Sequence, residues 1–398
     1  MSTSNSKSSN SPKLSSPRPQ GTEPADESAA ADAPSLESMR SEIDRVDDQL
    51  LELLERRADV ARRLAALKRS SGLSLRDADR EARLLARLEG LADAHGGLFP
   101  KSSIRPIFRE IISACLSLQE PQTVAYLGPP GTFSHIAARA AFGLGAKYVE
   151  LPSIGQVVDA VARGAVSYGL APIENSTEGA VGATLAALLE CDVMIERELV
   201  IPVSACLLAQ STDLSSIRRV YSHPQPLAQC RNWLAQNLPH AELVSSASTA
   251  AAAGEARVDE TAAAVGSHLS AELYDLKVVR ENIQDRPENA TRFCVLSKQD
   301  APRSGRDKTS LVFSTPHARG ALRRALTIFD DEGLNLTRIE SRPALGQRWQ
   351  YVFFTDVEGH RSDAEVSRAI ERLRTDCSTV KVLGSYPRCD APENLGTS

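Results

Sequence analysis

The chain has 398 residues, a length that exceeds one hydrophobic core and predicts two to four domains. Its composition, 42% hydrophobic and 24% charged, is typical of a soluble globular protein, and no apolar run approaches the ~20 residues that span a membrane. The net charge of −5 argues against a nucleic-acid-binding protein. Seven scattered cysteines predict neither a disulfide framework nor a metal site, and with no secretory signal we expect a reducing, cytoplasmic location.

The first 120 residues predict a tail followed by helices. Residues 1–35 are rich in serine and proline, with few large apolar residues, which predicts disorder. From 36 to 70 apolar residues recur every three or four positions, which predicts one long helix; shorter helices are expected at about 76–94 and 102–118. A helix this long needs long helical partners, for which a second chain is one source. We expect an all-α domain over residues 36–120.

Charged residues occupy unexpected positions in this helical region. Arg57 lies on the apolar face, and Lys68, eleven residues later, projects from the same side. Asp77, Arg80 and Glu81 share a face of the next helix. One interpretation is an exposed ladder of ion pairs. The other is a site for an anionic ligand, because a buried arginine needs a partner and binds carboxylates well.

Residues 121–299 predict an α/β domain. TVAYLG at 123–128 and VSYGLAPI at 166–173 have the composition of buried strands, and a helical pattern follows each of them. This alternation continues to residue 298 and predicts mainly parallel strands. The length is sufficient for two lobes with a cleft between them.

Four strand ends in this domain carry small polar residues. Helix capping explains each of these turns by itself, but together they predict a cleft at the carboxyl edge of a sheet, where helix N-termini favour an anion. The first, GPPGTFSH, lacks the lysine and the spacing of a phosphate-binding loop. The candidate ligand-binding side chains at these turns are Thr132, Ser134, Glu174, Asn175, Ser176, Gln225 and Ser267.

The segment ENATRF at 288–293 allows three interpretations of Thr291. Asn289-Ala290-Thr291 fits the pattern of an N-glycosylation site, but a cytoplasmic chain largely removes that interpretation. Thr291 is then either a strand-edge residue without a special role or a hydroxyl that takes part in chemistry.

Residues 306–390 follow a polar linker and predict a small α+β domain. The strand and helix patterns come in the order βαββαβ, which is the ferredoxin-like split arrangement.

The helical region resembles the all-helical chorismate mutase family, in the strings MRSEIDRVDDQLLELLERRADVARRLAALK and RDADREARLL. The resemblance implies a pericyclic rearrangement of chorismate, catalysed by holding one conformer and stabilising developing charge. It implies that Arg40 and Arg57 bind the substrate carboxylates, Arg40 from across a dimer, and that Lys68 and Gln119 contact the ether oxygen. Three further residues would contact the ring hydroxyl or support that contact: Asp77, Arg80 and Glu81.

GPPGTFSH, APIENS, YSHPQP and NATRF together resemble the prephenate dehydratase family. The resemblance implies that prephenate loses carbon dioxide and hydroxide, with Thr291 as the catalytic hydroxyl and Glu174 as the alternative proton donor. It implies orienting roles for Asn175 and Gln225. Arg292 is either a partner for a substrate carboxylate or part of a structural ion pair.

GALRRAL at 320–326 and ESRP at 340–343 resemble the ACT-type amino-acid-binding module. The whole chain therefore resembles the bifunctional chorismate mutase/prephenate dehydratases of phenylalanine synthesis, which need no metal or organic cofactor, and we expect a homodimer inhibited by phenylalanine. Two alternatives remain, a dehydratase with a helical domain that only dimerises and an aromatic-acid sensor without turnover. The expected phenylalanine site comprises Gly320, Ala321, Leu322, Glu340, Ser341, Arg342 and Pro343.

Overall fold

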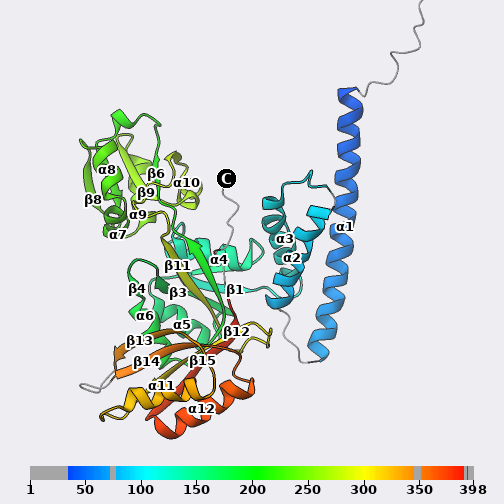
Figure 1. Ribbon diagram of the computed structural model, residues 1–398. Helices are drawn as coiled ribbons and strands as arrows, with labels where there is room; N and C mark the ends of the chain where they lie inside the picture. Colours follow the sequence, from blue (N-terminus) through cyan, green and yellow to red (C-terminus); the bar gives the residue numbers. More distant parts are fainter. Residues whose placement is uncertain (1–34, 72–77, 95, 345–350, 390–391, 393–398) are drawn as a thin grey trace, which may run out of the picture. The chain divides into compact units, whose positions relative to one another are not determined.

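The computed structural model describes residues 35–71, 78–94, 96–344, 351–389 and 392 (Figure 1). The chain divides into two compact units, Met1–Arg56 and Arg57–Ser398. The expected disordered tail lies outside the described residues except for Ser35, and Asp77 also lies outside them. Among the described helices, none is long and apolar enough to cross a membrane.

Three helices form the N-terminal region: α1 (Leu36–Ser70), α2 (Ala78–Ala94) and α3 (Lys101–Ser117). Ser35 caps α1, since its Oγ accepts a hydrogen bond from the Ser38 N–H at 3.0 Å. Arg105 of α3 donates to both carboxylate oxygens of Glu89 on α2, each at 3.0 Å, and this bidentate pair joins the two helices. The apolar side chains spaced along α1 are exposed in the single chain: Met39, Ile43, Val46, Leu50, Leu53, Val60, Leu64 and Leu67.

The first lobe of the α/β domain is a mixed sheet with strand order β2-β1-β3-β11-β5. β1 lies between β2 and β3 and is parallel to both, whereas β11 runs antiparallel to β3 and to β5. The expectation of mainly parallel strands is therefore wrong, because β11 enters this sheet on the return of the chain from the second lobe. The elements are β1 (Thr123–Leu127), α4 (Phe133–Phe142), β2 (Lys147–Leu151), α5 (Ile154–Ala162), β3 (Tyr168–Asn175), β4 (Gly179–Ala180), α6 (Gly182–Glu190), β5 (Met194–Pro202) and β11 (Ala290–Ser297).

The second lobe has its own sheet, with strand order β10-β6-β9-β7-β8, and a separate hydrophobic core. The chain passes between the lobes twice, from β5 to β6 and from β10 to β11, and Figure 1 shows these two crossings side by side. The elements are β6 (Cys206–Ala209), η2 (Leu214–Ser216), β7 (Arg219–Ser222), α7 (Pro224–Gln229), α8 (Arg231–Asn237), β8 (Glu242–Ser245), α9 (Thr249–Val258), β9 (Ala262–Gly266), α10 (His268–Tyr274) and β10 (Lys277–Arg280).

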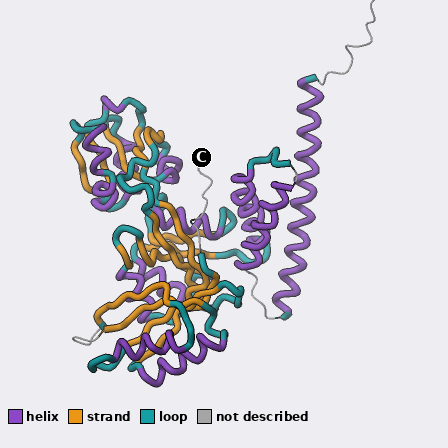
Figure 2. The backbone as a smooth tube through the Cα atoms, viewed as in Figure 1, coloured by secondary structure: helices purple, strands orange, loops and turns teal. Residues whose placement is uncertain are grey.

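The C-terminal domain confirms the predicted βαββαβ order. Its antiparallel sheet has the strand order β13-β14-β12-β15, and both helices cover one face (Figure 2). The elements are β12 (Asp307–Ser314), α11 (Ala321–Asp331), β13 (Leu336–Pro343), β14 (Tyr351–Glu358), α12 (Ala364–Asp376) and β15 (Thr379–Pro387).

The other face of this C-terminal sheet packs against the first lobe. Leu383 of β15 and Phe354 of β14 belong to the same buried cluster as Ile195 and Cys294 of the first lobe. Lys381 of β15 donates to the carbonyl oxygens of Leu188 and Cys191 at 2.8 and 2.7 Å, where α6 ends. Gly384 lies so close to Ile195 that an added Cβ would overlap the Ile195 backbone. The first lobe and the C-terminal domain thus share one core.

Candidate active site

A cleft of about 1100 Å³ lies between the two lobes of the α/β domain. The first lobe contributes the ends of β1 and β3 and the start of β11, and the second lobe contributes the starts of α7 and α9. Of the residues expected to bind ligand or catalyse, this cleft is lined by Thr132, Ser134, Asn175, Gln225 and Thr291.

Helix N-termini, rather than basic side chains, give this cleft its capacity for anions. Thr132 caps α4 by accepting from the His135 N–H, and Ser248 caps α9 by accepting from the Ala251 N–H at 2.9 Å. Both caps line the cleft, whereas none of the described residues that line it is arginine or lysine. The first N–H groups of a helix and its dipole attract negative charge, so carboxylates are favoured at these two ends.

Thr291 and Asn175 form the most enclosed polar pair in the cleft. They are directly opposite each other on the antiparallel strands β11 and β3, and only 9% and 8% of their surfaces are exposed. The Asn175 Nδ2 donates to the Thr291 Oγ1 at 2.9 Å. The Asn175 Oδ1 accepts from the backbone N–H groups of Thr177 and Glu178 at 3.0 and 3.3 Å. These bonds favour the amide orientation in which the Asn175 nitrogen faces Thr291.

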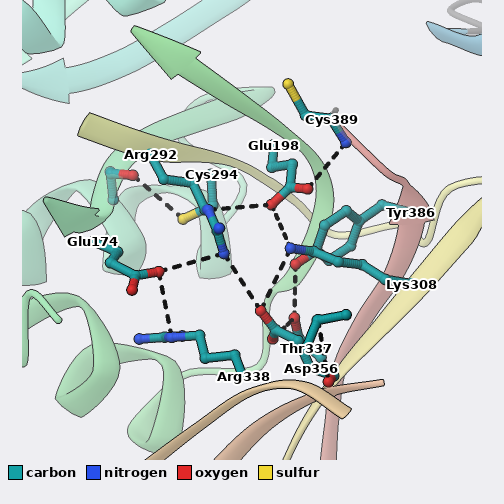
Figure 3. A network of polar contacts seen from close by, with 12 residues as sticks. Glu174, Glu198, Arg292, Cys294, Lys308, Thr337, Arg338, Asp356, Tyr386 and Cys389 are labelled. Atoms are coloured by element: carbon teal, nitrogen blue, oxygen red, sulfur yellow. Dashed lines mark hydrogen bonds and ion pairs between the residues drawn. The ribbon is translucent and has the colours of Figure 1, made fainter. Parts of the chain in front are cut away.

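Glu174 and Arg292 point away from the cleft, because successive side chains of a strand face opposite sides. Their side chains form an ion pair, with Arg292 Nη1 3.3 Å from Glu174 Oε2 (Figure 3). Neither residue lines the cleft. The expected roles of Glu174 as the acid and Arg292 as a carboxylate partner are therefore not supported by their positions, and the structural ion pair is the interpretation of Arg292 that fits.

The Glu174–Arg292 pair belongs to a larger charged cluster, which we call the interdomain cluster; it consists of Glu174, Glu198, Arg292, Lys308, Arg338 and Asp356 (Figure 3). Its shortest ion pair joins Lys308 Nζ to Glu198 Oε2 at 2.6 Å, with both side chains at least 94% buried. Arg338 of β13 reaches Glu174 Oε2 at 3.5 Å. Strands of the C-terminal domain thus contact the backs of the strands that carry Asn175 and Thr291.

The electrostatics of the interdomain cluster follow from burial and from the excess of carboxylates near Arg292. Burial alone would lower the pKa of Arg292. The charges of Glu198, Glu174 and Asp356 raise this pKa by more than burial lowers it, so the net shift is upward. Burial, followed by the charges of Asp356 and Glu198, raises the pKa of Tyr386 well above its ordinary value. The arginine stays charged and the phenol neutral, which suits a permanent structural contact.

Two expected ligand-binding hydroxyls are engaged elsewhere. Ser176 Oγ accepts from the Ala290 N–H at 3.0 Å and donates to the Asn289 Oδ1 at 3.4 Å. Ser267 caps α10 and donates to the Gly131 carbonyl at 2.8 Å, which ties the second lobe to the GPPG turn. Neither residue lines the cleft.

Several residues of the cleft and its surroundings had no assigned role in the sequence analysis. Glu150 and Glu178 line the cleft, and Gln229 Nε2 contacts Glu178 Oε1 at 3.5 Å between α7 and the β3–β4 turn. His223 also lines it, and its Nδ1 accepts from the Gln225 N–H at 3.4 Å as the cap of α7. Carboxylates at the mouth of a cleft carry no signal in a single sequence, since they look like solvated surface residues.

In the helical region Arg57 is half-buried and contacts the third helix. Its Nη1 donates to Cys115 Sγ at 2.8 Å and to the Ile111 carbonyl at 3.4 Å, and Cys115 is buried. Arg69 donates to the Gln119 carbonyl. Lys68, Arg80 and Glu81 lie on α1 and α2, and Arg40 lies on the part of α1 that belongs to the other unit. The buried end of α3 thus provides a polar environment for one of the expected carboxylate-binding arginines.

The expected phenylalanine site is divided in the single chain. Gly320, Ala321 and Leu322 line a cavity of about 270 Å³ together with Tyr351 and Phe353. Residues 340–343 lie along β13 outside that cavity, with Arg342 Nε 3.0 Å from Glu340 Oε1 and Arg342 Nη2 donating to the Ala180 carbonyl at 3.1 Å.

Known proteins resemble the chain over all three regions. Family models match it as chorismate mutase type II over residues 39–120, prephenate dehydratase over 124–301 and an ACT domain over 309–375. The bifunctional chorismate mutase/prephenate dehydratase of Aquifex aeolicus is 43% identical over 354 residues, which cover 89% of this chain and 98% of the relative. The chain belongs to this bifunctional family.

Two further relatives agree with that membership. The bifunctional enzyme of Pseudomonas aeruginosa is 40% identical over 365 residues, covering 90% of this chain and 99% of the relative. The solved prephenate dehydratase of Arthrobacter aurescens, in complex with L-Phe, superposes with a TM-score of 0.63 at 37% identity and covers 68% of this chain and 91% of that one. As a bifunctional chorismate mutase/prephenate dehydratase, the chain is both an isomerase and a lyase. The expected enzyme class and fold class are confirmed, and the sensor and single-activity alternatives are not supported.

Proposed function

We propose that the cleft between the two lobes is where prephenate is converted to phenylpyruvate, within a dehydratase domain of residues 121–299. The observation that carries this proposal is the buried Thr291–Asn175 pair, which lies in a cleft bordered by the N-termini of α4 and α9. Prephenate is a dianion, and its carboxylates match helix N-termini with the hydroxyls of Thr132 and Ser248.

The reaction at this site breaks a carbon–carbon bond and a carbon–oxygen bond of prephenate and completes its aromatic ring. The bond between the ring carbon and its carboxylate breaks, and carbon dioxide leaves without the electron pair. That pair enters the ring as a π bond and completes the aromatic system. The carbon–oxygen bond at the opposite ring position breaks at the same time, and hydroxide leaves with its electrons and takes up a proton to become water. The protein therefore needs a hydrogen-bond donor at the departing oxygen.

Thr291 is the side chain that we assign to this departing oxygen. Its Oγ1 already accepts a bond from Asn175, and the described residues provide no acceptor for its own proton. Glu174 lies on the other face of β3 and is held by two arginines. We assign orienting roles to Asn175 and Gln225 and substrate binding to Thr132 and Ser134.

The helical domain, residues 36–120, is proposed to rearrange chorismate to prephenate at a site completed by a second copy of the chain. The exposed apolar series along α1 needs a partner, and a second α1 has the same length and spacing. Arg57 and Arg40 would bind the two carboxylates, the latter from the other copy. The remaining residues assigned to this site are Lys68, Gln119, Asp77, Arg80 and Glu81.

The C-terminal domain, residues 306–390, is proposed to bind phenylalanine and lower dehydratase activity. Gly320, Ala321 and Leu322 border a small cavity, and residues 340–343 lie elsewhere on the same sheet. In a homodimer, residues 340–343 of one copy would lie against the cavity bordered by residues 320–322 of the other copy. The interdomain cluster then supplies a physical route from β13 to the backs of β3 and β11.

Absorbance assays on the full chain test these proposals together. We expect loss of chorismate, formation of phenylpyruvate from prephenate, and suppression of the second reaction by phenylalanine. Both reactions as assigned need no metal or organic cofactor, so adding a metal chelator should leave both reaction rates unchanged. Sedimentation velocity should show a dimer. A Thr291→Val variant with the parent rate of phenylpyruvate formation would remove the cleft assignment, and a monomer with full mutase activity would remove the shared helical site.

A further inference from the structure

We propose that Asn289 is a positioning residue for the dehydratase reaction, because its side-chain oxygen holds the Asn175 amide in the orientation that makes Thr291 a donor into the cleft. This inference rests on the proposed function of the cleft. Asn289 does not line the cleft and would act through Asn175.

The three side chains form a continuous hydrogen-bonded chain. Asn289 Oδ1 accepts from Asn175 Nδ2 at 3.2 Å, and the same nitrogen donates to Thr291 Oγ1 at 2.9 Å. Asn289 is 3% exposed, so solvent does not compete for its oxygen. Ser176 Oγ donates a second, longer hydrogen bond to the same oxygen at 3.4 Å.

The direction of each bond follows from donor counting. A primary amide nitrogen carries two protons, and Asn175 directs one to Asn289 and the other to Thr291. Rotating the Asn175 amide by half a turn would place its oxygen against the Asn289 oxygen and its nitrogen against the N–H groups of Thr177 and Glu178. Both new contacts are repulsive. The Asn289 oxygen therefore stabilises the orientation in which Thr291 accepts from Asn175 and keeps its own proton for a ligand.

A second observation separates this role from simple packing. The Nδ2 of Asn289 is buried and has no hydrogen-bond partner among the described residues. Leaving a buried N–H without a partner costs free energy, and such groups in native structures call for an explanation. The opposite amide orientation would place this nitrogen against the Asn175 donor. The required position of the oxygen thus accounts for the unsatisfied nitrogen.

Asn289 also has a structural contact that competes as an explanation. Its backbone carbonyl accepts from the Val203 N–H at 2.8 Å, where the two crossings between the lobes meet. That bond uses no side-chain atom, so side-chain variants leave it available. A residue needed only for packing at this crossing would change stability without any dependence on Thr291.

The test is a double-mutant cycle on the full chain, with prephenate as substrate. Asn289→Leu keeps the approximate volume and removes the oxygen, Asn289→Asp keeps an oxygen in place, and Thr291→Val removes the hydroxyl. We expect Thr291→Val to lower kcat roughly a hundredfold and Asn289→Leu roughly tenfold, both with little change in KM. Asn289→Asp should retain most of the kcat that the leucine variant loses. The chorismate mutase rate of each variant and its Tm are the internal controls.

The decisive result is the double variant. If Asn289 acts through Thr291, Asn289→Leu in the Thr291→Val background should lower kcat no further. Independent, multiplying losses overturn the proposal, as does an aspartate variant as slow as the leucine variant. If Asn289→Leu does not fold, the same comparison is made with Asn289→Asp and Asn289→Ser. An unchanged rate in Thr291→Val overturns the site assignment itself, whereas an active-site Thr291 with no coupling overturns only the role of Asn289.

Discussion

The two faces of the β3–β11 pair carry opposite kinds of chemistry. On the cleft side are the neutral Asn175 and Thr291, joined by one hydrogen bond. On the other side are the half-buried Glu174 and Arg292, one position away in each strand, at the edge of the buried charges of the interdomain cluster. One strand pair therefore forms both the floor of the cleft and the contact with the C-terminal domain.

The physical basis of this difference is that one face would bind a charged ligand from solvent, whereas the other buries charges that are permanently paired. In the proposed assignment a substrate dianion occupies the cleft. Neutral N–H donors at helix ends then bind it without a basic side chain that would have to be desolvated on binding. The interdomain cluster, in contrast, keeps permanent charges paired in a protein core. Adjacent residues of one motif, such as Thr291 and Arg292, can therefore have unrelated functions.

The largest effect is expected from Lys308→Met on the charged face. Lys308 and Glu198 are almost fully buried, and removing the lysine leaves the Glu198 carboxylate with the Cys389 N–H at 3.1 Å and a longer 3.8 Å contact to Arg292 as its partners. Breaking a buried pair costs about 3–5 kcal/mol, so the free energy of unfolding should fall by an amount of this order. Thermal and urea unfolding measure it, with the exposed Lys298→Met as the control. Equal Tm values for the two variants would contradict the assignment of Lys308 to a buried ion pair.

The next largest effects are expected from variants of the neighbours Thr291 and Arg292, which should change different quantities. Thr291→Val should lower the dehydratase kcat by roughly two orders of magnitude and lower Tm only modestly, because it removes little volume but leaves one Asn175 N–H without its acceptor. Arg292→Met should do the reverse, with a lower Tm and an unaltered KM for prephenate, because its side chain lies outside the cleft. A large rise in KM for Arg292→Met would restore this arginine as a carboxylate partner.

A smaller effect is expected on feedback. Arg338 is the residue of β13 that contacts Glu174 at 3.5 Å, so Arg338→Met removes one link between the C-terminal sheet and β3. Changes of roughly three- to tenfold are typical when one coupling residue is lost, and the phenylalanine concentration for half inhibition should rise by that factor. Arg374→Met, on the exposed side of α12, is the matched control. Unchanged inhibition in Arg338→Met would show that the effector acts by another route.

The smallest effect concerns the pH dependence of stability through His135, on the first turn of α4. Burial, with a smaller contribution from Arg139, lowers the pKa of His135 from its ordinary value of 6.5, and its Nδ1 accepts from the Gly131 N–H at 3.2 Å. The unfolded chain therefore takes up a proton at a higher pH than the folded chain does. Stability from the neutral ring is present above pH 6.5 and is lost as the pH falls from there through the folded-state pKa. His135→Gln should flatten this part of the curve, whereas the exposed His240→Gln should not.

The order and type of the elements followed from the sequence because local signals determine them. Three- and four-residue spacing placed α1, and the βαββαβ order of the last domain was visible in alternating apolar runs. Thr291 and Asn175 were found through motifs, and the structure places them side by side.

The sequence-based predictions failed where the answer depends on the direction of a side chain or on contacts between segments distant in the sequence. Glu174 and Arg292 were assigned to the site with their neighbours, although the two-residue period of a strand already placed them on the opposite face. Asn289 was considered only as a glycosylation site. The interdomain cluster brings Glu198, Lys308 and Asp356 together from three strands distant in the sequence, and one sequence holds no signal for such a meeting. The antiparallel entry of β11 depends on the route of the chain between lobes, which local patterns do not specify.

The junction between the first lobe and the C-terminal sheet limits how these domains can be recombined. Lys381 satisfies carbonyl groups at the end of α6, and Gly384 allows β15 to approach Ile195 without a side chain between them. A dehydratase truncated after residue 299 would expose a hydrophobic surface and leave that helix end uncapped. A chimera that exchanges the C-terminal domain between relatives would therefore have to take β15 and the surface of the first lobe that it contacts from the same parent. A cut at the linker would separate these two matched surfaces.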